Sequence, residues 1–217
     1  MSPSHRRIGK PAALASLLGL LCVALIALVA FAWQPLRSFD TVLARSVHHR
    51  AHAYDGITQV NRVLSDWVWD PWTLRALCAV VVAGLWLRGA RRMAVLLAVT
   101  CAFGTLAQQT LKALIGKERP QWQQPLDSAQ YAAFPSGHAM TATVTCGLLL
   151  WLLRRHGVNG AAWATAVTVA VVSVLGVGLT RIWLGVHWPS DVVGGWLLGT
   201  LTVVVAVAAY RRTEVRA

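Results

Sequence analysis

The sequence predicts an all-α protein, a six-transmembrane-helix bundle with short interfacial helices between spans one and two. The first observation is composition, because the 217 residues are 56% hydrophobic and only 13% charged, with a mean hydropathy of +0.55. A soluble domain carries about a quarter charged residues. The second observation is that apolar runs near the roughly 20 residues that cross a bilayer recur along the chain. The third is that most basic residues fall in short segments between those runs.

Charge and cysteine content narrow the class further. The net charge is +12, with 20 Lys+Arg against 8 Asp+Glu. Basic residues in short segments between apolar runs are typical of membrane topology, so we expect no nucleic-acid partner. The cysteines lie inside apolar runs without ligand spacing, which predicts neither a disulfide framework nor a zinc site. They are Cys22, Cys78, Cys101 and Cys146.

The first apolar run, residues 12–33, follows a basic segment over residues 1–11. Ala30-Phe31-Ala32 resembles a signal-peptide cleavage site. The run is nevertheless longer than the apolar core of about 7–15 residues in a signal peptide. We therefore expect a retained first span, with cleavage as the alternative.

Residues 34–70 form the longest polar stretch, and apolar residues recur in it at helical spacing. That pattern predicts short amphipathic helices at the membrane interface. His48 and His52 have the i,i+4 spacing of two metal ligands, but no carboxylate or cysteine completes a site. We interpret both as part of the polar face of an interfacial helix.

Five further apolar runs complete the bundle, and with residues 12–33 they predict six spans in one domain that covers residues 1–217. Several of these runs are near the short limit for a span. No internal repeat or low-complexity tract stands out. The remaining spans are predicted over residues 72–87, 93–115, 138–153, 161–180 and 189–209.

Charge and aromatic residues predict the orientation of this bundle. The short segments at one face hold 11 of the 20 basic residues: Arg6, Arg7, Lys10, Arg88, Arg91, Arg92, Arg154, Arg155, Arg211, Arg212 and Arg216. Tryptophans gather at the other face, as in an interfacial aromatic belt: Trp33, Trp67, Trp69, Trp72, Trp122, Trp183 and Trp188. The positive-inside rule therefore makes the basic face cytoplasmic and places both termini there.

Three polar clusters fall on the outer face if the six spans alternate. They occupy residues 112–120, 134–138 and 181–191. These positions are the end of span three, the start of span four and the turn between spans five and six. A compact bundle can therefore bring their side chains to one point.

The first cluster carries two cations, Lys112 and Arg119. They are seven residues apart, so a continuing helix would place them on one face. A charge near the end of an apolar span is costly and usually functional. The alternative is a lysine that snorkels to the interface.

The second cluster opens span four with Ser136, Gly137 and His138. A helix N-terminus has unpaired N–H groups and the positive end of the helix dipole, so it attracts anions. Glycine lets the backbone approach a ligand closely, and the serine can cap the helix or donate to the ligand. An ordinary serine cap is the alternative interpretation.

The third cluster combines Arg181, at the end of span five, with His187 and Asp191 at the start of span six. Pro189 is favoured in the first turn of a helix and so marks where span six begins. Asp191 lies four residues beyond His187 and can reach its ring. It would hold one ring nitrogen as N–H and leave the other as a nucleophile. A capping pair at the interface is the alternative.

Together the clusters supply three cations, a helix N-terminus and two histidines, which suits a multiply charged tetrahedral oxyanion. Positioning and charge stabilisation are what phosphoryl transfer needs. The clusters hold no group of carboxylates that would bind a metal. We therefore expect neither a metal nor a cofactor, with the cations acting directly.

About ten positions resemble, in order and spacing, the three-part signature of the type 2 phosphatidic acid phosphatase (PAP2) superfamily. They are Lys112-(six residues)-Arg119-Pro120, Pro135-Ser136-Gly137-His138 and Arg181-(five residues)-His187-(three residues)-Asp191. The six-span layout is similar to the family's integral membrane branch. Thr180 departs from the serine that usually precedes the arginine, but it keeps the hydroxyl.

The resemblance implies a role for each site residue. His187 would attack phosphorus and form a phosphohistidine, with Asp191 orienting it. His138 would protonate the leaving group and then activate water. The family needs no metal. The phosphate oxygens would be held by Lys112, Arg119, Ser136, the Gly137 N–H and Arg181.

The resemblance also implies a partner, a membrane lipid phosphate. We expect a lipid phosphatase of a bacterial-type inner membrane, with its site on the outer, periplasmic face and undecaprenyl diphosphate as its substrate. The first alternative is a phosphatase of phosphatidic acid or phosphatidylglycerophosphate. The second is a lipid phosphotransferase that uses undecaprenyl diphosphate as donor, and the third is a non-catalytic membrane protein.

Overall fold

The computed structural model describes residues 10–215, which form eight α-helices and one π-helical segment, η1. The all-α prediction is confirmed. Arg6, Arg7 and Arg216, which enter the predicted orientation, lie outside the described residues. In chain order the elements are α1 (Lys10–Ala30), α2 (Gln34–Ala53), α3 (Asp55–Val63), η1 (Leu64–Val68), α4 (Pro71–Leu87), α5 (Arg91–Ile115), α6 (Gly137–Arg155), α7 (Gly160–Trp183) and α8 (Pro189–Val215).

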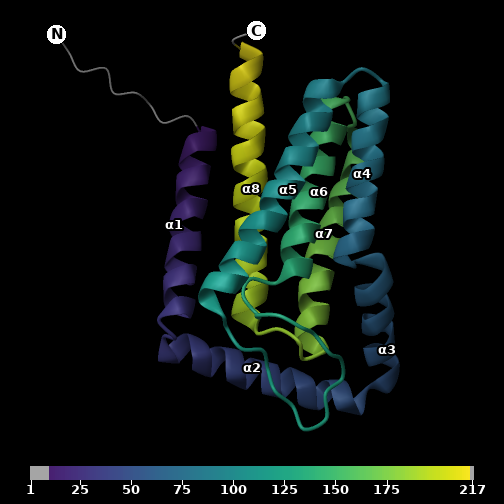
Figure 1. The fold of residues 1–217 in the computed structure, drawn as a ribbon. Helices are drawn as coiled ribbons and strands as arrows, with labels where there is room; N and C mark the ends of the chain where they lie inside the picture. The colour runs from purple at the N-terminus through teal and green to yellow at the C-terminus, as the bar shows by residue number, and fades with distance from the viewer. Residues whose placement is uncertain (1–9, 216–217) are drawn as a thin grey trace, which may run out of the picture.

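Six long helices, α1 and α4 to α8, run along a common direction, and α2 crosses one end of the bundle (Figure 1). α6 lies at the centre, in contact with α4, α5, α7 and α8. The start of α1 and the end of α8 lie at the end away from α2 (Figure 1). The loop 116–136 and the turn 184–188 both lie at the α2 end, so the three polar clusters share that end.

Five helical stretches are long and apolar enough to cross a membrane. α6 is not among them, and it carries buried polar side chains such as Thr143 and Thr145. A helix enclosed by other helices can carry more polar residues than one that faces lipid. The five stretches are Ala12–Ala30, Asp55–Leu87, Arg91–Ile115, Gly160–Trp183 and Pro189–Glu214.

Residues 34–70 form longer elements than the short helices predicted for this stretch. α2 is one helix of 20 residues, and α3 continues directly into η1. The interpretation of His48 as part of a polar face is wrong, because the residue is buried. Its ring stacks on Trp122, with ring centroids 4.0 Å apart. The loop 116–136, which carries Trp122, covers this side of α2.

α8 lies close against α6 because glycines face the neighbouring helix. A Cβ added at Gly195 would come within 2.8 Å of the Ser136 carbonyl oxygen, and one at Gly199 within 2.8 Å of the Thr143 Cβ. This approach lets the Ser136 N–H donate to the Asp191 carbonyl oxygen at 2.9 Å. The start of α6 and the start of α8 are thereby held side by side.

Candidate active site

The turn between α7 and α8 places His187 inside the protein. Gly185 has φ +74°, a left-handed conformation that favours glycine. A Cβ there would lie 2.6 Å from Trp122 Nε1 and 3.0 Å from His48 Nδ1. The Gly185 carbonyl oxygen accepts a hydrogen bond from Trp122 Nε1 at 2.7 Å. The loop therefore packs tightly on the turn, and His187 is only 2% exposed.

His187 and Asp191 face each other as predicted. His187 Nδ1 lies 3.4 Å from Asp191 Oδ2, which also accepts the Trp188 backbone N–H at 2.8 Å. Both side chains are almost completely buried. A carboxylate beside Nδ1 favours the tautomer with the N–H at that nitrogen. Nε2 is then left with its lone pair.

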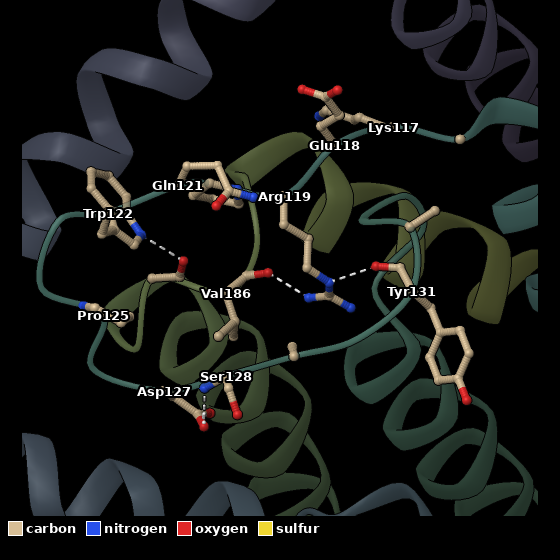
Figure 2. A pocket seen from close by; sticks show the side chains of 15 residues that line it. Lys117, Glu118, Arg119, Gln121, Trp122, Pro125, Asp127, Ser128, Tyr131 and Val186 are labelled. Atoms are coloured by element: carbon tan, nitrogen blue, oxygen red, sulfur yellow. Dashed lines mark hydrogen bonds between the residues drawn. The ribbon is translucent and has the colours of Figure 1, made fainter.

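Arg119 reaches that free nitrogen. Its Nη1 lies 3.3 Å from His187 Nε2 and donates to the Val186 carbonyl oxygen at 2.5 Å. Its Nε donates to the Tyr131 carbonyl oxygen at 2.8 Å, and Nη2 donates to the Gln130 carbonyl oxygen at 3.1 Å. Figure 2 shows the guanidinium held between Tyr131 and Val186. The guanidinium is therefore fixed in place beside the predicted nucleophile.

Burial and positive charge keep His187 neutral. Burial is the main cause that lowers the pKa of His187 well below 6.5, and the charges of Arg119, Arg181, Lys112 and Lys117 lower it further. Burial, followed by the charge of Arg181, also lowers the pKa of Arg119 to about 10, so Arg119 stays charged at pH 7. A neutral imidazole beside cations is suited to attack an anionic phosphorus centre.

Lys112 and the start of α6 form another wall of the site. Lys112 is buried instead of extended into solvent, and its Nζ donates to the Ala132 carbonyl oxygen. The Ser136 hydroxyl is buried without a hydrogen-bond partner among the described residues, so it is free to donate to a ligand. A Cβ at Gly137 would lie 2.7 Å from Gln108 Nε2. Glycine is therefore the residue that fits between Gln108 and the start of α6.

Arg181 is 4% exposed and comes from the last turn of α7. Its Nη1 donates to Ser65 Oγ at 2.6 Å and lies 3.4 Å from Asp127 Oδ2. Its buried Nε has no partner within residues 10–215. The Thr180 hydroxyl donates to Asn61 Oδ1 at 2.7 Å, and this bond ties α7 to α3.

His138 lies in the first turn of α6 and is half-buried. The charges of Arg181, Arg119 and Lys112 act on this ring as they act on His187. The two histidines therefore share one electrostatic environment. The structure thus brings together, at one end of the bundle, residues from all three predicted clusters.

The loop 116–136 forms the outer wall of a pocket of about 770 Å³ above the turn at Gly185 and Val186. Arg119 points into this pocket from one side, and the Tyr131 ring points away from it (Figure 2). Pockets of about 300–1,000 Å³ are typical of small-ligand sites. The pocket therefore offers space for a polar headgroup directly beside Arg119.

The sequence patterns did not identify Lys117, Asp40 and Ser190 as part of the site. Lys117 Nζ donates to Asp191 Oδ1 at 2.8 Å, to Asp40 Oδ2 at 2.9 Å and to Ser190 Oγ at 2.7 Å. Lys117 lies inside the first cluster, and this position is the one signal that points to it. Asp40 and Ser190 are 150 residues apart, and no local pattern joins them.

His48 and His52 do come together, with their Nε2 atoms 3.1 Å apart. His52 Nε2 also lies 3.1 Å from the Gln124 carbonyl oxygen. Within residues 10–215, no group of three or more His, Cys, Asp and Glu side chains is placed to hold a metal ion. The two imidazoles therefore contribute to the contact between α2 and the loop.

The family model of the PAP2 superfamily matches residues 92–214 of this chain. Phosphatidylglycerophosphatase B of Bacillus subtilis is 36% identical over 103 residues, which cover 46% of this chain and 50% of the relative. Undecaprenyl-diphosphatase of Sulfolobus acidocaldarius is 35% identical over 68 residues, 31% of this chain and 29% of the relative. Lipid A 1-phosphatase of Rhizobium etli is 29% identical over 122 residues, 52% and 48% of the two chains. The chain therefore spans half or less of each of these relatives.

The crystal structure of the transmembrane PAP2-type phosphatidylglycerolphosphate phosphatase of Bacillus subtilis has the same fold, with a TM-score of 0.70. The likeness covers 91% of this chain and 96% of that chain at 23% sequence identity. The fold defines the class as multi-pass integral membrane proteins of the PAP2 type. The chain belongs to the PAP2 superfamily, as its three-part signature predicted.

Proposed function

We propose that this protein is a metal-independent membrane lipid phosphatase that works through a phosphohistidine intermediate. The observation that carries the proposal is the geometry of His187. Its Nδ1 lies 3.4 Å from Asp191 Oδ2, and its Nε2 lies 3.3 Å from Arg119 Nη1. A nucleophile held between an orienting carboxylate and a phosphate-binding cation is what the first chemical step requires.

In the first step, the Nε2 lone pair of His187 forms a bond to phosphorus while the P–O bond to the lipid breaks. The leaving oxygen takes the electron pair of that bond and a proton from His138, which acts as general acid and is held in its protonated form by the negative charge of the bound phosphate. Asp191 stabilises the positive charge that develops on the His187 ring. The phosphoryl oxygens are held by Lys112, Arg119, Arg181, the Ser136 hydroxyl and the Gly137 N–H.

In the second step, a water oxygen forms a bond to phosphorus while His138, now neutral, takes a proton from that water. The P–N bond breaks, and its electron pair returns to Nε2 of His187. Inorganic phosphate leaves. His138 is protonated again and His187 is neutral, so both histidines are ready for the next substrate.

We propose undecaprenyl diphosphate as the substrate, with phosphatidic acid and phosphatidylglycerophosphate as the alternatives. The site lies at the end of the apolar helices, which is the depth of a lipid headgroup in a bilayer. Its cations and the adjoining pocket of about 770 Å³ suit a headgroup with several phosphate oxygens. One relative, named as an undecaprenyl-diphosphatase, supports the diphosphate, and another, named as a phosphatidylglycerophosphatase, supports the alternative.

We also propose that α6 is a sixth span, because it lies at the centre of the bundle between α5, α7 and α8 (Figure 1). Six spans place the start of α1 and the end of α8 on one side of the membrane. Arg88, Arg91, Arg154 and Arg155 lie in or next to the short turns at that side. The positive-inside rule supports a cytoplasmic location for it and an outer, periplasmic location for the active site.

The test is phosphate release by the purified full-length protein in detergent with EDTA present. Undecaprenyl diphosphate, phosphatidic acid and phosphatidylglycerophosphate are compared by kcat/KM. We expect release that EDTA does not reduce, with the highest kcat/KM for undecaprenyl diphosphate. Strict dependence on an added metal, or no release from any of the three lipids, would overturn the proposal. Labelled phosphate that moves to a second lipid instead of to water would indicate a phosphotransferase.

A further inference from the structure

Lys117 joins three segments of the chain behind the nucleophile. Its Nζ donates to Asp191 Oδ1 at 2.8 Å, to Asp40 Oδ2 at 2.9 Å and to Ser190 Oγ at 2.7 Å. Asp40 belongs to α2, whereas Ser190 and Asp191 belong to the first turn of α8. An ammonium group has three N–H donors, and each of them has an acceptor here.

Asp40 completes the cluster from the side of α2. Its Oδ1 accepts the Ser190 backbone N–H at 2.9 Å, and its Oδ2 accepts the Ser190 hydroxyl at 2.6 Å. Asp40 is 3% exposed and Asp191 is 0% exposed. One cation therefore serves two buried carboxylates. Removal of that cation would leave both negative charges buried without their shared partner, which is strongly unfavourable.

The two oxygens of Asp191 have separate contacts. Oδ1 accepts from Lys117, whereas Oδ2 accepts the Trp188 N–H and faces His187 Nδ1. Lys117 and the Trp188 N–H therefore fix the rotation of this carboxylate about its last torsion. That rotation decides whether an oxygen of Asp191 lies in line with the His187 ring.

We propose that Lys117 and Asp40 are positioning residues for the nucleophile. They hold Asp191 in the orientation that keeps the N–H of His187 on Nδ1 and its lone pair on Nε2. Through Asp40, the amphipathic helix α2 is connected to the reacting histidine. The inference rests on the proposed function, because it assigns new residues to the same site.

The other role open to Lys117 is that of a fourth phosphate-binding cation. It lies in the same cluster as Lys112 and Arg119, and it lines the same pocket as Arg119. However, its three donors are taken by protein oxygens, and a turn toward phosphate would leave Asp40 and Asp191 without their cation. The two roles differ in kinetics, because loss of a ground-state phosphate contact raises KM, whereas misplacement of the nucleophile lowers kcat.

The test measures kcat and KM for phosphate release from undecaprenyl diphosphate by the full-length protein in detergent. We expect Lys117→Met to lower kcat by about 10- to 100-fold with KM changed by less than about threefold, because a misplaced reacting group costs up to about 100-fold. Lys117→Arg keeps the charge and should recover kcat to within about fivefold of the original protein. Asp40→Asn should lower kcat by about 3- to 10-fold. Arg45→Met removes an exposed positive charge from α2 instead, and this matched control should leave both constants unchanged.

A second measurement asks whether Lys117 acts through Asp191. In the Asp191→Asn background, addition of Lys117→Met should lower kcat by less than about twofold more, because the two changes remove one shared interaction. Losses that multiply would overturn the proposal. So would a rise in KM of more than about tenfold with kcat unchanged, which is the signature of a phosphate ligand.

Loss of folded protein is separated from loss of positioning by the choice of variants. If Lys117→Met does not purify in folded form, the double variant Asp40→Asn/Lys117→Met takes its place, since it removes one of the two carboxylates together with the cation. If the Lys117 and Asp40 variants release phosphate as fast as the unchanged protein and the Arg45→Met control do, the positioning role alone is overturned. No release by the unchanged protein from any lipid phosphate would overturn the proposed function itself.

Discussion

The two ends of the bundle carry the same kinds of charged residue in different surroundings. At the end away from α2, Arg155 pairs with Glu214, and their side chains are 38% and 32% exposed. At the α2 end, Lys117 pairs with Asp191, and their side chains are 18% and 0% exposed. An exposed ion pair contributes about 0–1 kcal/mol, whereas breaking a buried one costs about 3–5 kcal/mol.

The histidines show the same contrast. His156 is exposed at the end of α6, and its Nδ1 lies 2.8 Å from the Leu152 carbonyl oxygen of its own helix. His187 is 2% exposed, with Asp191 on one side and Arg119 on the other. Polar groups at the end away from α2 thus contact water and their own helix, whereas those at the α2 end contact residues from distant segments of the chain. Charge therefore suits membrane orientation at the first end and chemistry at the second.

The largest expected effect separates the two histidines. His187→Ala should lower kcat for phosphate release by about 10⁵-fold or more, because it removes the nucleophile and an assembled catalytic unit fails together. His156→Ala is the matched control from the other end and should retain the original rate. Both are measured on purified protein with the same lipid phosphate. A folded His187→Ala variant that keeps more than about 1% of the rate would contradict the assignment of His187 as the nucleophile, and with it the difference between the two ends of the bundle.

Arg119 and Arg154 provide the next comparison. Arg119→Gln should lower kcat/KM by about 10²- to 10³-fold, the usual loss when one donor to the phosphoryl oxygens is removed. Arg154 is exposed, and it donates to the Val158 carbonyl oxygen at 3.3 Å. Arg154→Gln should therefore leave kcat/KM unchanged. Equal losses in the two variants would show that net charge, and not the placement of Arg119, determines activity.

Sequence patterns predicted the helices and the three clusters because both are local signals. Pro189 is the first residue of α8, and Gly137 is the first residue of α6, so the predicted starts of these helices hold to within one residue. The C-terminal end of α8 was predicted less well. The apolar run ends near residue 209, but the helix continues to Val215 because its basic residues also favour helix.

The remaining part of the site depends on contacts between distant residues. Ser65 and Arg181 are 116 residues apart, and Asp40 and Ser190 are 150 apart. A short polar residue on an amphipathic helix has the same pattern whether it faces water or another segment. Burial of Asp40 follows only from the way α2 crosses the end of the bundle (Figure 1). The sequence pattern therefore located the groups that we propose to face phosphate, but not the residues behind them.

The pH dependence of kcat reports how far the surroundings at the α2 end lower the pKa of His187 from its value in solvent. An imidazole with an ordinary pKa of about 6.5 would lose about eightfold of its neutral form between pH 7 and pH 5.5. Burial first, and then the neighbouring cations, place the pKa of His187 well below 6.5. The neutral nucleophile should therefore persist, and kcat at saturating substrate should fall by less than about twofold over that range.

Arg119→Gln serves as the internal control for this pH profile. Removal of a positive charge near His187 raises the pKa of the ring, so the acid limb of kcat should move to higher pH. Burial remains, so the pKa should stay below its ordinary value. An eightfold fall of kcat in the original protein, together with an identical acid limb in Arg119→Gln, would contradict a buried, cation-flanked nucleophile.

The smallest effect is expected at the exposed pair of Arg155 and Glu214. Arg155→Gln should lower Tm by less than about 4 °C, because an exposed pair is worth at most about 1 kcal/mol and that amount shifts Tm by about 2–4 °C in a chain of this size. Thermal unfolding in detergent measures the shift, and phosphate release should stay at the original rate. Glu214→Gln should give the same small shift, since either change breaks the same pair. A fall in Tm of more than about 6 °C in both variants would place this end of the bundle on a par with the buried cluster around Lys117, and burial would no longer explain how the two ends differ.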